Sequence, residues 1–171
     1  MLSIDVGVRN LAYCVAEVDS GVVRFVDVGC VDVIGASNTS KDAKRRCVLE
    51  WVLEHETVAG CDVVVIEQQP RFNPTMVQVS HYLGAALETL AVVEGREVRV
   101  VYQPAKAKNA LIGVPGAAKR KDRYKNAKRT SVEFAMACPE IAKHVSRFSK
   151  KDDVCDAVVQ LLAYLRTWTF A

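Results

Sequence analysis

The chain of 171 residues lacks any long uninterrupted apolar run. Although 50% of its residues are hydrophobic, no stretch approaches the roughly 18 apolar residues that a membrane-spanning helix needs. The N-terminus also lacks a basic segment followed by an apolar core, because Asp5 and Arg9 fall where that core would begin. We therefore expect no membrane partner and no secretory signal.

Metal-binding patterns of cysteine and histidine are absent as well. The three histidines show no ligand spacing, and no C-x-x-C pair occurs among the six cysteines. A zinc site is therefore not expected, and the cysteines are typical of small buried residues in a reducing intracellular compartment. Internal repeats and low-complexity linkers are also missing, so we expect residues 1–171 to form a single domain.

Charge is distributed unevenly along the chain. The net charge is +3, yet residues 106–129 hold nine basic residues and one acid, a net charge of +8. A solvated surface normally mixes both signs. The block therefore favours a polyanionic partner such as nucleic acid, with a merely solvated loop as the alternative.

Hydrophobic periodicity and turn residues predict an α/β fold. The expected strands cover residues 1–18, 22–28, 30–34, 62–67 and 98–102, and the expected helices cover residues 41–57, 75–94, 123–138 and 151–165. Gly7 and Asn10 mark a change of backbone shape in the first strand, and Pro139 is expected to end the third helix. This order of elements indicates a mixed five-stranded sheet flanked by helices.

Four acidic residues occur where a nuclease that binds several metal ions needs them. Asp5 interrupts the first apolar run, Glu67 ends a buried strand, and Asp153 and Asp156 lie near the start of the last helix. A carboxylate is unfavourable to bury unless it is paired or binds a metal, and carboxylates suit Mg²⁺ and Mn²⁺. If the four converge, two such ions can activate a water and stabilise the leaving oxygen of a phosphodiester.

The start of the last helix contains a further aspartate, Asp152. Ser149 and Asp152 fit a capping box, and acids in a first turn are stabilised by the helix dipole. A cap explains Asp152 without a catalytic role, whereas Asp156 lies one turn further along the helix. We therefore select Asp153 and Asp156, and not Asp152, as the candidate metal ligands.

Three stretches of the sequence resemble those of a known family. They are SIDVGVRN (residues 3–10), VVIEQQ (residues 64–69) and KDDVCDA (residues 151–157). In this order they resemble the RuvC-like Holliday junction resolvases of the retroviral-integrase/RNase H superfamily, and among these the poxvirus resolvases. The resemblance spans nearly the whole chain and implies an RNase H-like fold.

The resemblance also implies a set of site residues. The acids that match the family's metal ligands are Asp5, Glu67, Asp153 and Asp156. The spacing from Pro104 favours Lys108 over Lys106 as the family's active-site lysine. The implied cofactor is Mg²⁺ or Mn²⁺, as two ions per site, with no small-molecule cofactor.

From the basic block and the segment after residue 67 we expect a surface that contacts DNA. Within it, Phe72 could stack on an unpaired base at a branch point, with simple packing as the alternative. The residues expected to contact DNA are Arg71, Phe72, Lys106, Lys119, Arg120, Lys121, Arg123, Lys125, Lys128 and Arg129.

The implied function is a metal-dependent endonuclease that resolves four-way DNA junctions as a homodimer. For a viral member the implied role is the processing of replicated genome concatemers in the cytoplasm of the infected cell. We expect the dimer interface on the helix 75–94, with Met76, Tyr82 and Leu83 as exposed contacts. Two alternatives stay open: a general RNase H-like nuclease acting on flaps or hybrids, and a non-catalytic junction-binding protein.

Overall fold

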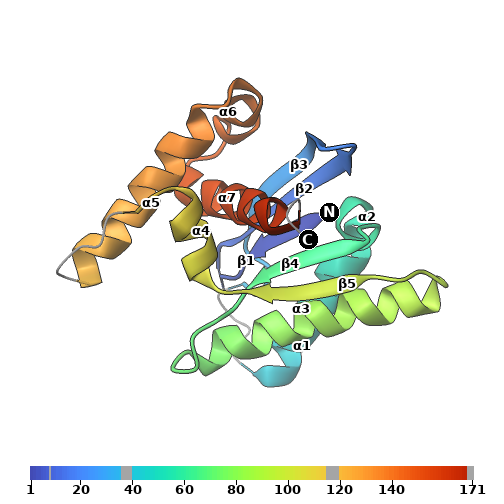
Figure 1. The fold of residues 1–171 in the computed structure, drawn as a ribbon. Coiled ribbons are helices and arrows are strands. Elements are labelled where there is room, and N and C mark those ends of the chain that lie inside the picture. The colour runs from blue at the N-terminus through green and yellow to red at the C-terminus, as the bar shows by residue number, and fades with distance from the viewer. Residues whose placement is uncertain (8, 36–39, 115–119, 169–171) are drawn as a thin grey trace.

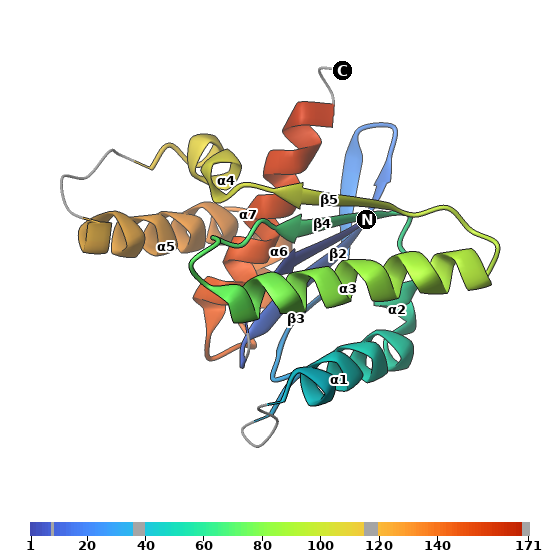
Figure 2. The ribbon, with the colours of Figure 1, turned by 90° about the horizontal axis from the view of Figure 1, so that it is seen from below.

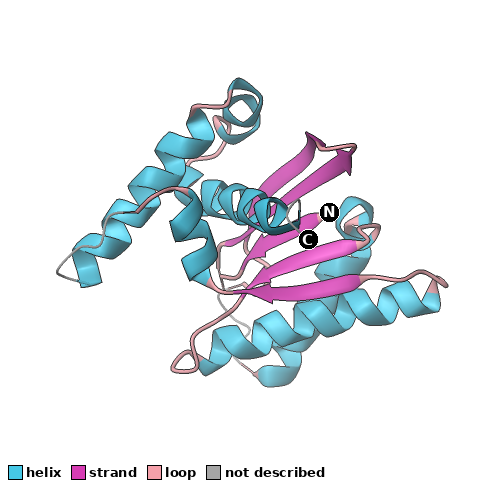
Figure 3. Cartoon of the chain, in the orientation of Figure 1, coloured by secondary structure: helices cyan, strands magenta, loops and turns pink. Residues whose placement is uncertain are grey.

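The computed structural model describes residues 1–7, 9–35, 40–114 and 120–168, and its centre is a five-stranded sheet (Figures 1 and 3). The strands lie in the order β3-β2-β1-β4-β5. The expected strand 1–18 is two strands, and residues 22–28 and 30–34 contribute to a single strand that ends at Val31. The bounds are β1 (Leu2–Asp5), β2 (Leu11–Asp19), β3 (Val22–Val31), β4 (Val63–Glu67) and β5 (Arg99–Gln103).

The loop between β1 and β2 reverses the chain directly after Asp5. Gly7 permits the turn, because a Cβ atom there would lie 2.3 Å from the carbonyl oxygen of Asn10. The chain returns as β2, antiparallel to β1, which is why the first predicted strand is split. The next reversal has positive φ at Ser20 (49°) and Gly21 (83°), as a two-residue hairpin turn requires.

The register of the parallel strands decides where the first two acids lie. β1 pairs with β4 in parallel, and β4 pairs with β5 in parallel. Because Ile4 is the partner of Ile66, the residues that follow them, Asp5 and Glu67, end neighbouring strands at the same edge. Sites in open α/β sheets form outside this carboxyl edge.

Helices cover both faces of the sheet (Figures 1 and 2). One face carries α1 (Lys41–Glu54) and α3 (Pro74–Val93), with the short α2 (Glu56–Ala59) packed against them. The other face carries α5 (Arg120–Met136), α6 (Pro139–Val145) and α7 (Lys151–Trp168), and α4 (Ala105–Leu111) packs against α7.

Two short helices, α4 and α6, were not predicted from the sequence. The expected helix 41–57 is also interrupted, since α1 ends at Glu54 and α2 begins after His55. Pro139 does follow the end of α5, but it also begins α6, because the missing N–H of proline is tolerated in a first turn.

The two faces of the sheet bury separate apolar clusters. Ile4 packs with the inner face of α1 and α3, while Leu161 of α7 packs with β2 and α6 on the other side. Leu83, expected at an exposed interface, is fully buried in the first cluster, and Met76 and Tyr82 are partly buried against it. The prediction of an exposed contact is therefore wrong for Leu83, whereas Met76 and Tyr82 are partly exposed and stay predicted contacts.

α3 is also long and apolar enough, by length and composition alone, to cross a membrane. No such helix was expected from the sequence. Val79, Leu83 and Leu87 of this helix are buried in the core, and the core helix of a globular protein has the same composition.

The cysteines are consistent with the expected role as small apolar residues. All six are free. Cys14, Cys61 and Cys155 are buried, and the other three are partly buried. Burial raises the pKa of Cys155 to about 12, so its thiol stays protonated and apolar at neutral pH.

Candidate active site

A cleft of about 1440 Å³ opens where the carboxyl ends of β1 and β4 meet the start of α7. Asp5 and Glu67 lie at the strand ends, while Asp153 and Asp156 lie three residues apart and therefore on one face of α7. All four predicted acids line this cleft, together with Lys108 of α4. Residues from four elements, separated by up to 151 positions in the sequence, are thereby brought to one place.

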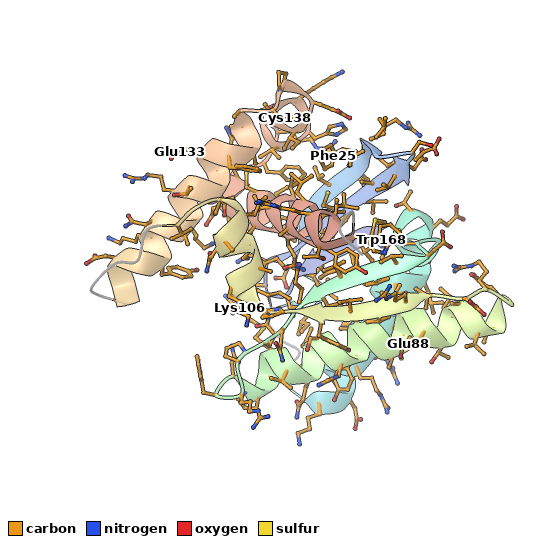
Figure 4. The ribbon with its side chains drawn as sticks, viewed as in Figure 1. Phe25, Glu88, Lys106, Glu133, Cys138 and Trp168 are labelled. Carbon is orange, nitrogen blue, oxygen red and sulfur yellow. The ribbon has the colours of Figure 1, made fainter. Side chains whose placement is uncertain are left out.

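Lys108 lies between acids that belong to two different elements. Its Nζ is 3.2 Å from Oε1 of Glu67 and 3.5 Å from Oδ2 of Asp156. The Lys108 residue is only 8% exposed. It lies on α4, the helix that begins directly after Pro104. Lys106, the alternative, is exposed on the same helix, near the end of β5 (Figure 4). The structure therefore brings Lys108, and not Lys106, to the acids.

The two strand acids respond differently to their surroundings. Burial, with the Glu67 and Asp156 carboxylates adding to it, raises the pKa of Asp5 well above its usual range, against the opposing effect of Lys108. Burial also tends to raise the pKa of Glu67, but the Lys108 ammonium and a hydrogen bond with Asp5 outweigh it and leave this pKa lowered. In the protein alone, Asp5 is therefore the harder of the two acids to ionise, and Glu67 is the easier.

Asp156 is buried on the side of α7 that meets Lys108. Burial raises its pKa, although Lys108 and a hydrogen bond with Ser131 of α5 oppose this shift. Burial would lower the pKa of Lys108, but Asp5, Glu67 and Asp156 outweigh it and leave that pKa above its usual value. Lys108 therefore stays charged and partly neutralises the buried acids.

Asp153 has its own cationic partner, Lys128 of α5. The Nζ of Lys128 lies 2.6 Å from Oδ1 of Asp153 and 2.6 Å from Oδ2 of Asp152. Burial tends to raise the pKa of Asp152, but the hydrogen bond from Lys128 outweighs it and lowers this pKa. The capping box of Ser149 and Asp152 stays a prediction, and the partner that the structure gives Asp152 is Lys128.

The residues expected to contact DNA fall into three groups. Three line the cleft: Arg71, Phe72 and Lys128. Three more are exposed on α4 and α5 and are not among the described residues that line the cleft: Lys106, Lys125 and Arg129. The remaining four have side chains outside the part of the chain that the structure describes: Lys119, Arg120, Lys121 and Arg123.

The site also contains polar residues that were not selected from the sequence. Ser131 contacts Asp156, and a signal for it was present, because it lies three residues after Lys128 and therefore on the same face of α5. Asn109 and Tyr124 line the cleft and have no pattern that would have distinguished them from surface residues. Four more lining residues belong to the stretches that carry the family resemblance, although no role was predicted for them: Arg9, Asn10, Gln68 and Gln69.

The donors in the cleft are carboxylate oxygens, the ligands that Mg²⁺ and Mn²⁺ prefer. Within the described ranges, no three acidic, histidine or cysteine side chains already lie close enough to hold one ion. The ammonium groups of Lys108 and Lys128 instead lie against the acids. Carboxylate oxygens that already bind the two ammonium groups fit a hard divalent cation. The ligands of that cation would be Asp5, Glu67, Asp153 and Asp156.

Comparison with known sequences gives a match over nearly the whole chain. A family model described as "Poxvirus A22 protein" matches residues 1–167. The "Uncharacterized protein 97L" of Invertebrate iridescent virus 3 is 33% identical over 144 residues. That match covers 78% of this chain and 66% of the viral relative, so the chain spans slightly less than two thirds of the relative's length.

Solved structures share the fold. Thermus thermophilus RuvC has a TM-score of 0.63 at 16% identity, covering 99% of this chain and 98% of that chain. The yeast mitochondrial Holliday junction resolvase Ydc2 has a TM-score of 0.65 at 13% identity, covering 96% and 78%. T. thermophilus RuvC in complex with a Holliday junction substrate has a TM-score of 0.55 at 18% identity, covering 99% and 98%. These likenesses confirm the predicted RNase H-like arrangement of a mixed sheet between helices.

Proposed function

The chain belongs to the poxvirus A22 protein family, and from this membership we propose that it is an endonuclease that resolves four-way (Holliday) DNA junctions with divalent metal ions. The observation that carries the proposal is the meeting of Asp5, Glu67, Asp153 and Asp156 with Lys108 in one cleft. The proposal is further supported by the structural relatives, since one is a Holliday junction resolvase and another was solved with a junction substrate.

The four carboxylates would hold one or two Mg²⁺ or Mn²⁺ ions. Such ions, when bound, activate a water and stabilise the leaving oxygen at a phosphodiester. The chain contributes the position of the ligands, because β1, β4 and α7 each present acids to the same cleft. Burial raises the pKa of Asp5 in the protein alone, so a proton bound there would be released when Asp5 becomes a ligand.

The basic residues would bind the DNA and stabilise charge at the cut. Lys108 remains charged beside Glu67 and Asp156, where it could neutralise charge that develops on the phosphate. Arg71 of the cleft would contact backbone phosphates, which positions the DNA without reading its sequence. Phe72, 74% exposed at the cleft, would stack on a base that is unpaired at the branch.

Symmetric resolution needs two active sites, and a homodimer supplies them most simply. Leu83 is buried, so the candidate contacts of this dimer on α3 are the partly exposed Met76 and Tyr82. A sedimentation experiment that found only one protomer on a junction would contradict the dimer.

For the viral role, we infer that the enzyme processes replicated genome concatemers in the cytoplasm of the infected cell. Undiminished production of unit-length genomes after inactivation of Asp153 would contradict that role.

The direct test is cleavage of a synthetic four-way junction with Mg²⁺. Asp153→Asn keeps the size of the side chain but removes its charge, so we expect nicking to fall by about a hundredfold or more. Binding of the junction in EDTA should persist, because Asp153 is acidic and repels the phosphates. The matched change Asp152→Asn, one residue away, should keep nicking within about tenfold of wild type, because Asp152 does not line the cleft.

The choice of substrate separates the proposal from its alternatives. Rates on junctions, flaps, plain duplex and RNA–DNA hybrid should be highest on the junction. Preference for the hybrid would leave a general RNase H-like nuclease. Tight junction binding by a wild-type protein that never nicks with Mg²⁺ or Mn²⁺ would leave a non-catalytic binding protein.

A further inference from the structure

Lys128 occupies an unusual position for a residue of a DNA-binding surface. Its ammonium does not extend into solvent but hydrogen-bonds to Asp152 and Asp153 at 2.6 Å each. The lysine side chain is 22% exposed and that of Asp153 is 16% exposed. The pair is therefore largely shielded from water, where an ion pair is screened less than on an open surface.

The same Asp153 is one of the four proposed metal ligands. Its Oδ1 atom is occupied by Lys128, so a divalent cation can bind this carboxylate only if Lys128 moves or shares it. The same ammonium also donates to Oδ2 of Asp152 at 2.6 Å, so two carboxylates hold it. We expect Lys128 to leave Asp153 when another anion takes the place of these carboxylates.

DNA supplies such an anion at this position. Lys128 lines the cleft, and its Nζ lies 5.6 Å from the centre of the Tyr124 ring, which is 63% exposed and lines the same cleft. A phosphate of DNA bound there would lie within reach of the flexible lysine stem. Lys108 differs, because it is buried between Glu67 and Asp156 inside the site and is not paired with Asp153.

Building on the proposed function, we propose that Lys128 is a positioning residue that holds Asp153 until DNA binds and then transfers to a backbone phosphate. In the protein alone it competes with the divalent cation for Asp153. Once DNA takes Lys128, Asp153 is released as a ligand. DNA binding and metal binding then strengthen each other, and this coupling must be reciprocal.

The first test measures metal binding without DNA. Calorimetric titration with Mn²⁺ at pH 8 compares wild type with Lys128→Met, which removes the competing charge. The variant should bind Mn²⁺ at least about fivefold more tightly, the lower end of usual coupling between sites. The matched control Lys125→Met removes the same charge from an exposed position on α5 and should stay within about twofold of wild type.

Two further variants keep this test decisive. Lys128→Arg retains the charge and should bind Mn²⁺ as weakly as wild type. Lys128→Gln replaces Lys128→Met if the latter does not fold, since glutamine keeps a hydrogen-bond donor without the charge. A Lys128→Met or Lys128→Gln protein that binds Mn²⁺ no more tightly than Lys125→Met would overturn the proposal.

The second test measures the coupling itself. Ca²⁺ should tighten junction binding by wild type more than by Lys128→Met, by about the factor that the variant gains in DNA-free metal affinity. An equal effect of Ca²⁺ on both proteins would contradict the transfer of Lys128.

The outcomes also separate the role of Lys128 from the proposed function. If wild type nicks junctions while both tests fail, only the role of Lys128 is lost. If no variant binds Mn²⁺ and wild type does not nick, the proposed metal-dependent function fails as well.

Discussion

At the scale of single residues, the cleft is a set of carboxylates whose charges are only partly balanced. Burial beside Glu67 and Asp156 raises the pKa of Asp5, because Lys108 alone cannot neutralise all three acids. Such an arrangement is unfavourable for the protein alone. It becomes favourable when a cation arrives, as is common at functional sites with shifted pKa values.

This imbalance predicts how stability depends on pH. The raised pKa of Asp5 means that the folded protein binds this proton more tightly than the unfolded chain. The free energy of unfolding in EDTA should therefore fall as pH rises from the ordinary aspartate value through the raised pKa, by about 1.4 kcal/mol for each pH unit in that interval. Asp5→Asn should lack this loss and unfold at higher denaturant concentration than wild type at pH 8, measured by urea titration.

Asp152→Asn provides a control with the opposite sign. Lys128 lowers the pKa of Asp152, so its charge stabilises the fold above its ordinary pKa and this contribution is lost on acidification. This variant should therefore be less stable than wild type at pH 8 and approach it at low pH. If the free energy of unfolding depends on pH equally in wild type and in Asp5→Asn, the raised pKa of Asp5 is contradicted.

At the scale of elements, the site depends on how α7 is seated on the sheet. Gln160, 2% exposed, donates from Nε2 to the carbonyl oxygens of Ile4 (3.2 Å) and Val65 (3.1 Å). These carbonyls belong to β1 and β4, the strands that end in Asp5 and Glu67. One amide thus connects the helix that carries two acids to the strands that carry the others.

Gln160→Leu should test this connection. Leucine has a similar size but leaves two buried carbonyl groups without this donor, so we expect a loss of about 1–3 kcal/mol in the free energy of unfolding. Mg²⁺ affinity should also weaken, because the helix acids lose their fixed distance from the strand acids. Gln78→Leu on α3, at a partly buried position on the other face, should change stability by less than about 0.5 kcal/mol.

At the scale of the whole molecule, the proposed DNA-binding side is the side of α4 and α5, while α1 and α3 cover the opposite face (Figures 1 and 2). Lys108 of α4 and Lys128 of α5 line the acidic cleft, and Lys106, Lys125 and Arg129 are exposed on the same two helices. They would attract the phosphates that the acids repel. Because such contacts release counterions, junction affinity should fall steeply with salt.

The salt dependence gives a prediction for this surface. Lys125→Ala should weaken junction binding and reduce the slope of log K against log salt by about 1, which fluorescence anisotropy between about 50 and 200 mM salt would measure. Lys41→Ala, an exposed lysine of α1 on the opposite face, should leave the slope unchanged. An equal effect of both substitutions would mean that DNA does not bind at the α5 side.

Several features could be predicted from the sequence because they depend on local chemistry. The apolar run before Glu67, the turn at Ser20 and Gly21 and the periodicity of α7 each determine their own element. The choice of Asp153 and Asp156 on one helix face also follows from spacing alone. The four acids were therefore identifiable as candidates from their spacing and from the apolar residues around them.

Other features depended on contacts between distant segments and could not be predicted. α4 is seven residues long, too short to be stable alone, and it packs against α7. The burial of Leu83 depends on how α3 packs on the sheet, which periodicity does not reveal.

Local chemistry alone shows which residues carry charge and which end of a strand or face of a helix they occupy, because backbone geometry and side-chain spacing are local. The place of Lys108 between Glu67 and Asp156, and the hydrogen bond from Lys128 to Asp153, arise only when the chain folds. Those pairings arise from the parallel register of β1 and β4 and from the packing of α4 and α5 on α7. Such contacts join segments far apart in the chain, where no spacing rule applies.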